Sequence, residues 1–301
     1  MCSLVSILTP TYNCGKYIHR LLDSILNQTY SRIEMHVVDD GSTDNTEAII
    51  KSYLPLFEHR GYVIHYHFQE NQGQSVAINN GLKLIKGDYL IWPDADDFFK
   101  TNDAVECLVE SLERKDSDYA MARCMIEYLD QENLKVIDQI DINQKYNEEL
   151  FEDCLYAMNG FWFCPGDYIV RTSALRMQIP GLEIFTDKNA GQNWQLMLPV
   201  LHKYKCVTIP QIKYSVLSRK ESHSRGHFVG RKATNSKLRS YRNTIIATLD
   251  AIPSMTDVER NNYKKNISRK YKKLIIKNNF IYLVGRPIRV LLKSFFSHLK
   301  K

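Results

Sequence analysis

Three aspartates fall within four positions after a short apolar run, and no other feature of the chain is more informative. The run, residues 89–92, has the aromatic and aliphatic composition of a buried strand, and Pro93 cannot donate to a sheet, so the strand should end there. Asp94, Asp96 and Asp97 follow at once. Carboxylates this close repel one another, and a divalent cation or a hydrogen-bonded ligand relieves the repulsion. A solvated acidic turn is the plain alternative.

The segments that must position these aspartates alternate between strands and helices. The periodicity of apolar residues predicts strands over 4–8, 33–38, 62–68 and 89–92, and helices over 17–26, over 76–86 and from near Glu47. Ser42 or Asp44 can cap the helix that begins near Glu47. Polar residues follow each strand. This order is typical of a mostly parallel α/β sheet, which binds ligands at the carboxyl ends of its strands.

Four segments resemble the motifs of the family 2 glycosyltransferases with the GT-A fold. In chain order they are VSILTPTYN at 5–13, VVDDGSTD at 37–44, NQG at 71–73 with Asn79 and Gly81, and DADD at 94–97. Their order and spacing match that family over about the first 100 residues, and the later half matches more loosely. The resemblance implies an α/β fold of GT-A type, with a Rossmann-like mixed, mostly parallel sheet flanked by helices.

The domain organisation that we predict follows from this resemblance and from the charge pattern. A GT-A domain would cover 1–225, with a nucleotide-sugar-binding half at 1–100 and an acceptor-side half at 101–225. A helical, basic extension would follow over 226–301.

The resemblance also implies roles for residues around a nucleotide. Pro10 and Tyr12 would lie against the base, Asp40 would accept a hydrogen bond from a uracil-type N–H, and Gly73 would line the nucleotide site. Asp94 would lie nearer the donor sugar or the ribose. The plainer interpretation is a strand-to-helix turn at the first two residues and helix capping by the carboxylates.

The diphosphate of the donor would meet a second set of residues. The resemblance assigns Asp96 to a Mn²⁺ or Mg²⁺ ion, Arg219 to phosphate oxygens, and His223 to the metal or to a phosphate hydrogen bond. A hard cation with oxygen ligands suits this chemistry, because it neutralises the leaving diphosphate. An exposed polar loop is the alternative for the last two residues.

The expected catalytic base is missing from its usual place. Many relatives carry an acidic pair at the start of a helix that faces the donor sugar, and here Gln192 and Asn193 stand there. An amide has no useful basicity near neutral pH. These two residues and Trp194 could still bind the acceptor, through amide hydrogen bonds and the indole face.

Three explanations remain for the base. Asp187 could supply it from the preceding loop, and this is the interpretation that we favour. Asp153 or Asp167 could reach the site from elsewhere. The domain could also bind a sugar nucleotide without efficient transfer, as a non-catalytic or scaffold protein.

The cysteines and the apolar segments indicate a cytoplasmic protein. Seven cysteines are scattered with no Cys-x-x-Cys pair, which favours reduced thiols. We expect no signal peptide, because no basic segment with a long apolar stretch begins the chain, and no run of about 18 apolar residues predicts a membrane span.

Positive charge is concentrated at the C-terminal end. Residues 261–301 hold twelve Lys and Arg and no acid, more than the net charge of +6, so the remainder is acidic or near neutral. Apolar residues of 284–299 fall on one helical face, which is typical of a helix on an anionic membrane surface. A helix that packs back on the domain is the alternative. We expect no nucleic-acid partner, because no known binding module accompanies these cations.

The resemblance to family 2 implies an inverting, metal-dependent glycosyltransferase. It would move a sugar from a nucleotide-diphosphate donor, expected to be a UDP-sugar, to a hydroxyl of a glycan or lipid-linked acceptor in polysaccharide or capsule biosynthesis. A dinucleotide-binding oxidoreductase would need Gly-x-Gly-x-x-Gly after the first strand, which is absent. A nucleotidyltransferase would need a Gly-rich, basic loop there, and 9–13 is not one.

Overall fold

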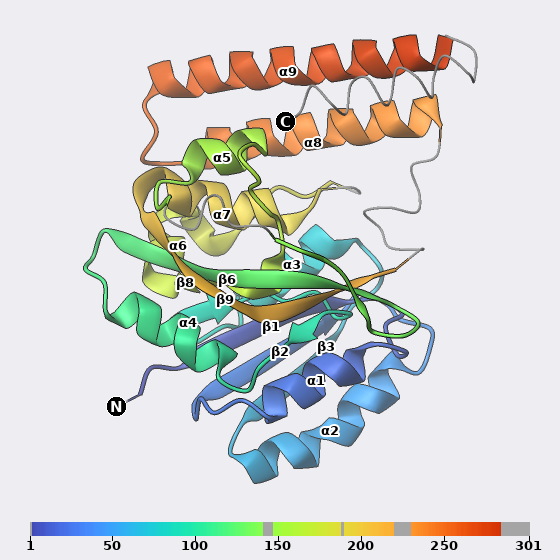
Figure 1. The fold of residues 1–301 in the computed structure, drawn as a ribbon, viewed down its shortest axis with the longest axis vertical. Helices are drawn as coiled ribbons and strands as arrows, with labels where there is room; N and C mark the ends of the chain where they lie inside the picture. The colour runs from blue at the N-terminus through green and yellow to red at the C-terminus, as the bar shows by residue number, and fades with distance from the viewer. Residues whose placement is uncertain (1, 141–146, 188–189, 220–229, 284–301) are drawn as a thin grey trace.

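One mixed sheet organises the residues that the computed structural model describes, 2–140, 147–187, 190–219 and 230–283 (Figure 1). Its strands follow the order β3-β2-β1-β4-β8-β6-β9-β5, and β7 pairs with β6 beside this path. They are β1 (Val5–Thr11), β2 (Ile33–Asp39), β3 (Val63–Phe68), β4 (Tyr89–Ile91), β5 (Phe98–Phe99), β6 (Tyr119–Asp130), β7 (Val136–Gln139), β8 (Tyr168–Arg171) and β9 (Lys205–Ser218). The first four strands are parallel. β8 is antiparallel to β4 and β6, while the long strands β6 and β9 pair in parallel.

Helices cover both faces of the sheet. They are α1 (Ile18–Leu26), α2 (Thr46–Arg60), α3 (Gln74–Leu82), α4 (Ala104–Glu113), α5 (Phe151–Tyr156), α6 (Thr172–Gln178), α7 (Gln192–Lys203), α8 (Arg231–Ala251) and α9 (Asp257–Leu283), with 3₁₀ turns at Pro165–Asp167 and Pro180–Leu182. The chain moves outward from β1 to β3 and then crosses back to β4, so right-handed connections put α1 and α2 on one face and α3 on the other.

The elements predicted for the first 100 residues are confirmed, with two differences. β1 continues through Pro10, because the Thr11 carbonyl accepts a hydrogen bond from the Asp40 N–H on the β2 side. Backbone groups alternate sides, so Pro10 faces the β4 side, where pairing has already ended at Ile7 and no donor is needed. Helix α3 ends at Leu82 rather than near 86, and the Lys86 N–H instead donates to the Glu34 carboxylate at 2.7 Å.

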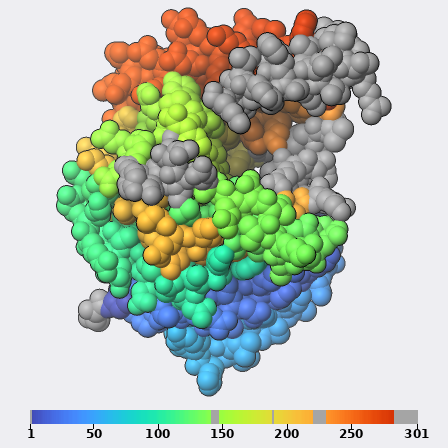
Figure 2. Space-filling view, in the orientation of Figure 1, coloured from blue at the N-terminus to red at the C-terminus, as the bar shows by residue number. Residues whose placement is uncertain are grey.

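The C-terminal helices α8 and α9 form a hairpin that packs on the sheet domain (Figures 1 and 2). The Tyr241 ring meets the Trp194 ring of α7 at 5.2 Å, and the Tyr263 ring meets that of Phe151 in α5 at 5.3 Å. Ile245 and other apolar residues of the hairpin belong to the same buried core as the sheet. The predicted extension is therefore helical over its described part. The boundary at 225/226 and the helix predicted over 284–299 lie outside the described residues.

Candidate functional site

The candidate site lies at the carboxyl ends of β1 and β4, where these two strands separate. β1 pairs with β4 only as far as Ile7, whereas it follows β2 as far as Thr11. β2 and β3 extend the sheet on one side of β1 and β4 extends it on the other. This reversal of strand order is the place where open α/β sheets bind their ligands. The acidic residues after β4 and the loops after β1 and β2 all end here.

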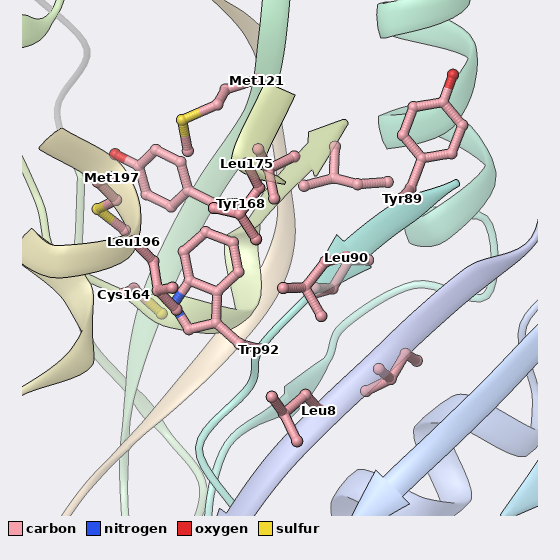
Figure 3. Packing of buried hydrophobic residues seen from close by; sticks show 14 of the residues in the cluster. Leu8, Tyr89, Leu90, Trp92, Met121, Cys164, Tyr168, Leu175, Leu196 and Met197 are labelled. Carbon is pink, nitrogen blue, oxygen red and sulfur yellow. The ribbon is translucent and has the colours of Figure 1, made fainter. Parts of the chain in front are cut away.

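Trp92 anchors the acidic motif to the core. Its indole is fully buried and points toward Leu196 and Cys164 on the α7 side of the sheet (Figure 3). The indole Nε1–H donates to Asn193 Oδ1 at 3.4 Å. The chain that follows Pro93 is therefore held at a fixed place on the sheet edge.

The three carboxylates of the motif have different partners. Asp94 accepts hydrogen bonds from the side-chain amides of Gln74, at 3.2 Å, and Gln192, at 3.3 Å. Burial and the nearby Asp96 carboxylate raise the pKa of Asp94 to about 7 despite these bonds. Asp97 is buried and accepts the Leu217 N–H of β9 at 2.8 Å. Burial, followed by the charges of Asp96 and Asp94, raises the pKa of Asp97 well above its ordinary value.

Asp96 forms an ion pair with Arg219, whose phosphate-binding role we predicted. Arg219 Nε lies 2.6 Å from Asp96 Oδ2, and both side chains are mostly buried. The guanidinium also lies over the ring of Tyr17, 4.8 Å from its centroid. The structure thus brings Arg219 to the acidic motif from the end of β9. His223 lies outside the described residues.

The donor set fits a divalent cation only in part. Among the described residues, no three His, Cys, Asp or Glu side chains converge as a metal site. Mg²⁺ is usually held by one or two carboxylates together with substrate phosphates, so a complete protein cage is not required. Burial and mutual repulsion raise the pKa of Asp94 and Asp97, and a hard cation at the motif would favour the charged forms of these carboxylates.

The two loops beside the site predicted for the nucleobase, after β1 and after β2, are joined by hydrogen bonds. Asn13, in a left-handed conformation with φ 50°, donates its N–H to Ser42 Oγ at 2.8 Å and accepts the Thr43 N–H on its side chain at 2.8 Å. Asp44 accepts the Thr46 N–H at 3.0 Å from the position before the N-cap, which is Asn45 and makes no capping hydrogen bond with its side chain. Tyr12 stands at this junction with 45% of its surface exposed, so its ring is available to a base.

Asp40 organises the loop before α3 rather than the helix after β2. Its Oδ1 accepts the Gln69 side-chain amide at 2.7 Å and the Gln72 N–H at 2.8 Å, and its Oδ2 accepts the Gly73 N–H at 2.8 Å. A carboxylate has about four acceptor positions, so one remains for a ligand N–H. Asp39 accepts the Ser42 N–H at 2.8 Å, so it holds the turn that follows β2.

The start of α7 reaches the acidic motif, as the resemblance implied, but its amides already have partners. Gln192 is buried against Asp94, and Asn193 accepts the Trp92 N–H. Trp194, which we predicted to bind the acceptor, is partly buried and also has protein partners. Its indole packs on Phe163, with ring centroids 4.8 Å apart, and on Tyr241, and its N–H donates to a carbonyl of α5. Trp194 therefore joins α7 to its neighbours.

The three candidates for the catalytic base are placed very differently. Asp167 is fully buried and accepts the Trp162 N–H, and Asp153 is buried and accepts the amides of Asn147, at 2.8 Å, and Asn159, at 2.7 Å. Neither can reach an acceptor from such positions, so both alternatives are wrong. Asp187 is exposed in the loop before α7.

That loop is fixed close to the site by its neighbours. The Asn79 side chain and the Ile184 backbone exchange two hydrogen bonds, at 2.8 and 2.9 Å, and the Gln195 amide donates to the Phe185 carbonyl at 3.0 Å. Sequence reasoning did not single out Tyr17 or Gln74, which contact Arg219 and Asp94. Neither residue carries a local signal, because each meets its partner only in the folded sheet.

Comparison with known proteins agrees with this geometry. Residues 6–170 match the model of glycosyl transferase family 2, which is more than half of the chain. The chain therefore belongs to this family. An uncharacterised glycosyltransferase of Rickettsia typhi is 36% identical over 155 residues, 52% of this chain and 46% of the relative. The match thus spans about half the length of that curated relative.

Two solved structures share the fold. S. aureus TarS 1–349, solved in complex with UDP-GlcNAc, matches with a TM-score of 0.67 at 18% identity, over 94% of this chain and 77% of that one. The mannosyltransferase PcManGT from Pyrobaculum calidifontis, solved in complex with GDP-Man and Mn²⁺, has a TM-score of 0.58 at 15% identity, over 99% and 81%. The predicted GT-A fold class is confirmed.

Proposed function

We propose that this glycosyltransferase moves a sugar from a UDP-sugar to a hydroxyl of a glycan or lipid-linked acceptor, with inversion at the anomeric carbon and with help from Mn²⁺ or Mg²⁺. The observation that carries the proposal is the meeting of Asp94, Asp96 and Arg219 after β4, while the exposed ring of Tyr12 follows the neighbouring strand β1. A nucleotide that reaches from Tyr12 to Asp96 would cross the strand-order reversal. The donor complexes of TarS and PcManGT support a nucleotide-sugar ligand for this fold.

The donor would lie along three loops. Pro10 and Tyr12 would border the base, the open acceptor position of Asp40 would take a base N–H, and Gly73 would let the chain approach the nucleotide. Gly73 has a φ of +96°, which favours glycine, and its N–H already fixes Asp40. Asp94 would accept a hydroxyl of the ribose or donor sugar.

The diphosphate would lie between Asp96 and Arg219. Asp96, with Asp94 nearby, would hold a Mn²⁺ or Mg²⁺ ion, and we assign His223 as a further ligand. When bound, the ion supplies stabilisation of the charge that develops on the departing diphosphate. Arg219 would pair with phosphate oxygens, because its planar guanidinium matches their geometry.

Transfer would then be a single displacement. The acceptor oxygen forms a bond to the anomeric carbon while the bond from that carbon to the diphosphate oxygen breaks on the opposite face. The acceptor proton passes to Asp187, the exposed carboxylate of the loop before α7. Gln192 and Asn193 would orient acceptor hydroxyls, while their amides also fix Asp94 and Trp92.

The basic C-terminal region would bring the enzyme to an anionic membrane surface, at the cytoplasmic face. Among the described residues, no helix is long and apolar enough to cross a bilayer. A peripheral contact through 261–301 would place a lipid-linked acceptor near the sheet edge.

The test is calorimetry with a panel of sugar nucleotides, with and without Mn²⁺, followed by transfer assays with glycan and lipid-linked acceptors. We expect one UDP-sugar to bind with metal present and to be consumed with an acceptor. Absence of binding by every sugar nucleotide in the presence of Mn²⁺ would contradict the proposal.

A further inference from the structure

The ion pair between Asp96 and Arg219 crosses the place assigned to the donor diphosphate. Asp96 follows β4, Arg219 follows β9, and Tyr17 precedes α1, so three separate elements meet at one guanidinium. Asp96 and Arg219 are mostly buried, with 14% and 21% of their side chains exposed. The pair is therefore part of the site and not a solvated surface contact.

Arg219 lies against one of the two oxygens of Asp96 that a metal ion could use. A Mg²⁺ ion lies about 2.1 Å from its carboxylate ligands. Arg219 Nε is 2.6 Å from Asp96 Oδ2, so the guanidinium fills one side of that oxygen, and a cation there would lie beside a positive charge. The guanidinium also neutralises the charge that would attract the ion, so metal and Arg219 compete for Asp96.

Arg219 can exchange its contact with Asp96 for a contact with a phosphate. Arg219 Nε is buried and makes no well-aligned hydrogen bond, although it is close to the carboxylate. Its second partner, the face of Tyr17, does not depend on Asp96. An arginine can stay stacked on an aromatic ring while its outer N–H groups turn from a carboxylate to a phosphate.

We propose that Arg219 keeps Asp96 closed to metal in the ligand-free protein, and that the nucleotide diphosphate opens it by taking Arg219 as its own partner. Metal and nucleotide then bind as a unit, and metal alone binds weakly. Tyr17 is the positioning residue that keeps the guanidinium beside the diphosphate after the exchange. This inference rests on the proposed function, because it needs a diphosphate at this edge.

The experiment measures Mn²⁺ affinity by the loss of the free-ion signal in electron paramagnetic resonance, with and without UDP. Wild-type protein should bind Mn²⁺ weakly alone and much more tightly with UDP. Arg219→Gln should bind Mn²⁺ alone at least about tenfold more tightly, because an adjacent cation is gone. The gain in affinity that UDP brings should shrink in the same variant. Arg219→Lys should resemble the wild type in binding Mn²⁺ alone, since it keeps the charge.

Two further variants separate this inference from general damage. Arg114→Gln removes an exposed arginine from an ion pair on α4 and should leave Mn²⁺ binding unchanged. Tyr17→Leu keeps Arg219 but should reduce the effect of UDP on Mn²⁺ affinity. Tyr17→Leu also tests the inference if thermal unfolding shows that Arg219→Gln does not fold.

The outcomes distinguish the two proposals. If wild-type protein binds Mn²⁺ with UDP, but Arg219→Gln and wild type bind Mn²⁺ alone equally well, the inference about Arg219 is wrong and the proposed function stands. If wild-type protein binds neither UDP nor Mn²⁺ in any combination, the proposed function fails and the inference fails with it.

Discussion

Asp94, Asp96 and Asp97 lie within four positions, yet each is held by a different kind of group. Asp97 receives a backbone N–H from β9, Asp94 receives two side-chain amides, and Asp96 receives a guanidinium. A backbone N–H cannot leave without disturbing a strand, whereas a charged side chain can exchange partners. Asp96 is therefore the carboxylate best suited to a ligand, and Asp97 the one that fixes the motif to the sheet.

Replacement of Asp96 by Asn tests the assignment of this carboxylate to the metal. We expect the transfer rate to fall by about 10²-fold or more, because stabilisation of the leaving diphosphate is lost. The free energy of unfolding should change by less than about 1 kcal/mol, since loss of the ion pair opposes relief of repulsion. Steady-state kinetics and urea unfolding provide the two readouts, with Asp116→Asn, at an exposed position, as control. A normal rate at limiting metal would contradict the assignment.

Replacement of Asp187 by Asn tests the assignment of this residue as the catalytic base. Loss of a general base should lower kcat by about 10²- to 10⁴-fold, whereas donor affinity should stay the same because the residue is placed on the acceptor side. Single-turnover rates and calorimetry with the donor measure the two effects. Glu183→Gln, an exposed acid in the same loop, is the matched control and should leave both unchanged. An unaltered rate in the Asp187 variant would exclude it.

At the scale of elements, the spacing of apolar residues predicted the strands and helices that local interactions define. The strands and helices of the first 100 residues follow from apolar spacing, and the loop motifs fall at the carboxyl ends of the strands. The second half of the sheet was not predictable in this way. β6 pairs with β9, so Met121 lies opposite Cys206, and Asp97 binds Leu217. Such contacts join residues far apart in the sequence, and no local periodicity encodes them.

The same limit explains what was missed at the site. The contacts of the Trp194 indole with Phe163 and Tyr241 could not be foreseen, because these neighbours come from other segments. The pairing of Arg219 with Asp96 was likewise hidden, although each residue was singled out alone.

The ion pair between Asp103 and Lys213 joins the start of α4 to β9 and should make stability depend on acid pH. Hydrogen bonds from Lys213 and Thr101 lower the pKa of Asp103 from 3.8 to about 2. A carboxyl whose folded pKa is depressed stabilises the fold above its ordinary pKa, and this contribution disappears as pH falls through about 2.

Asp103→Asn should therefore destabilise the protein near pH 7 by about 1–3 kcal/mol, because it leaves the buried Lys213 ammonium without its charged partner. The difference from wild type should shrink as pH falls from 4 toward 2. Urea unfolding over that range measures it. Asp138→Asn, at an exposed position on β7, should show no such trend. A difference that is constant with pH would argue against the ion pair.

At the scale of the whole molecule, the hairpin of α8 and α9 covers the end of the domain opposite α2 (Figure 2). Ile267 and Tyr271 on one side of α9 belong to the common core. Its other side carries the basic face, which we define as Lys265, Arg269, Lys272 and Lys273, all exposed. Spacing of four, three and one residues keeps these cations on one side of the helix. Ile276 and Phe280, 57% and 55% exposed, continue that side toward the C-terminus.

Cations beside exposed apolar side chains are what an anionic membrane surface attracts, and each basic residue near such a surface contributes about 1 kcal/mol. Replacement of the basic face by four Gln residues should therefore weaken binding to vesicles that contain phosphatidylglycerol by a hundredfold or more, on the order of the summed charge effect. Sedimentation with vesicles measures this. Gln at Lys51, Lys83, Lys115 and Lys135 is the control with the same net charge, and it should bind like the wild type. If the two quadruple variants lose binding equally, attraction depends on total charge and not on the surface of α9, and the hairpin would then serve only to complete the core.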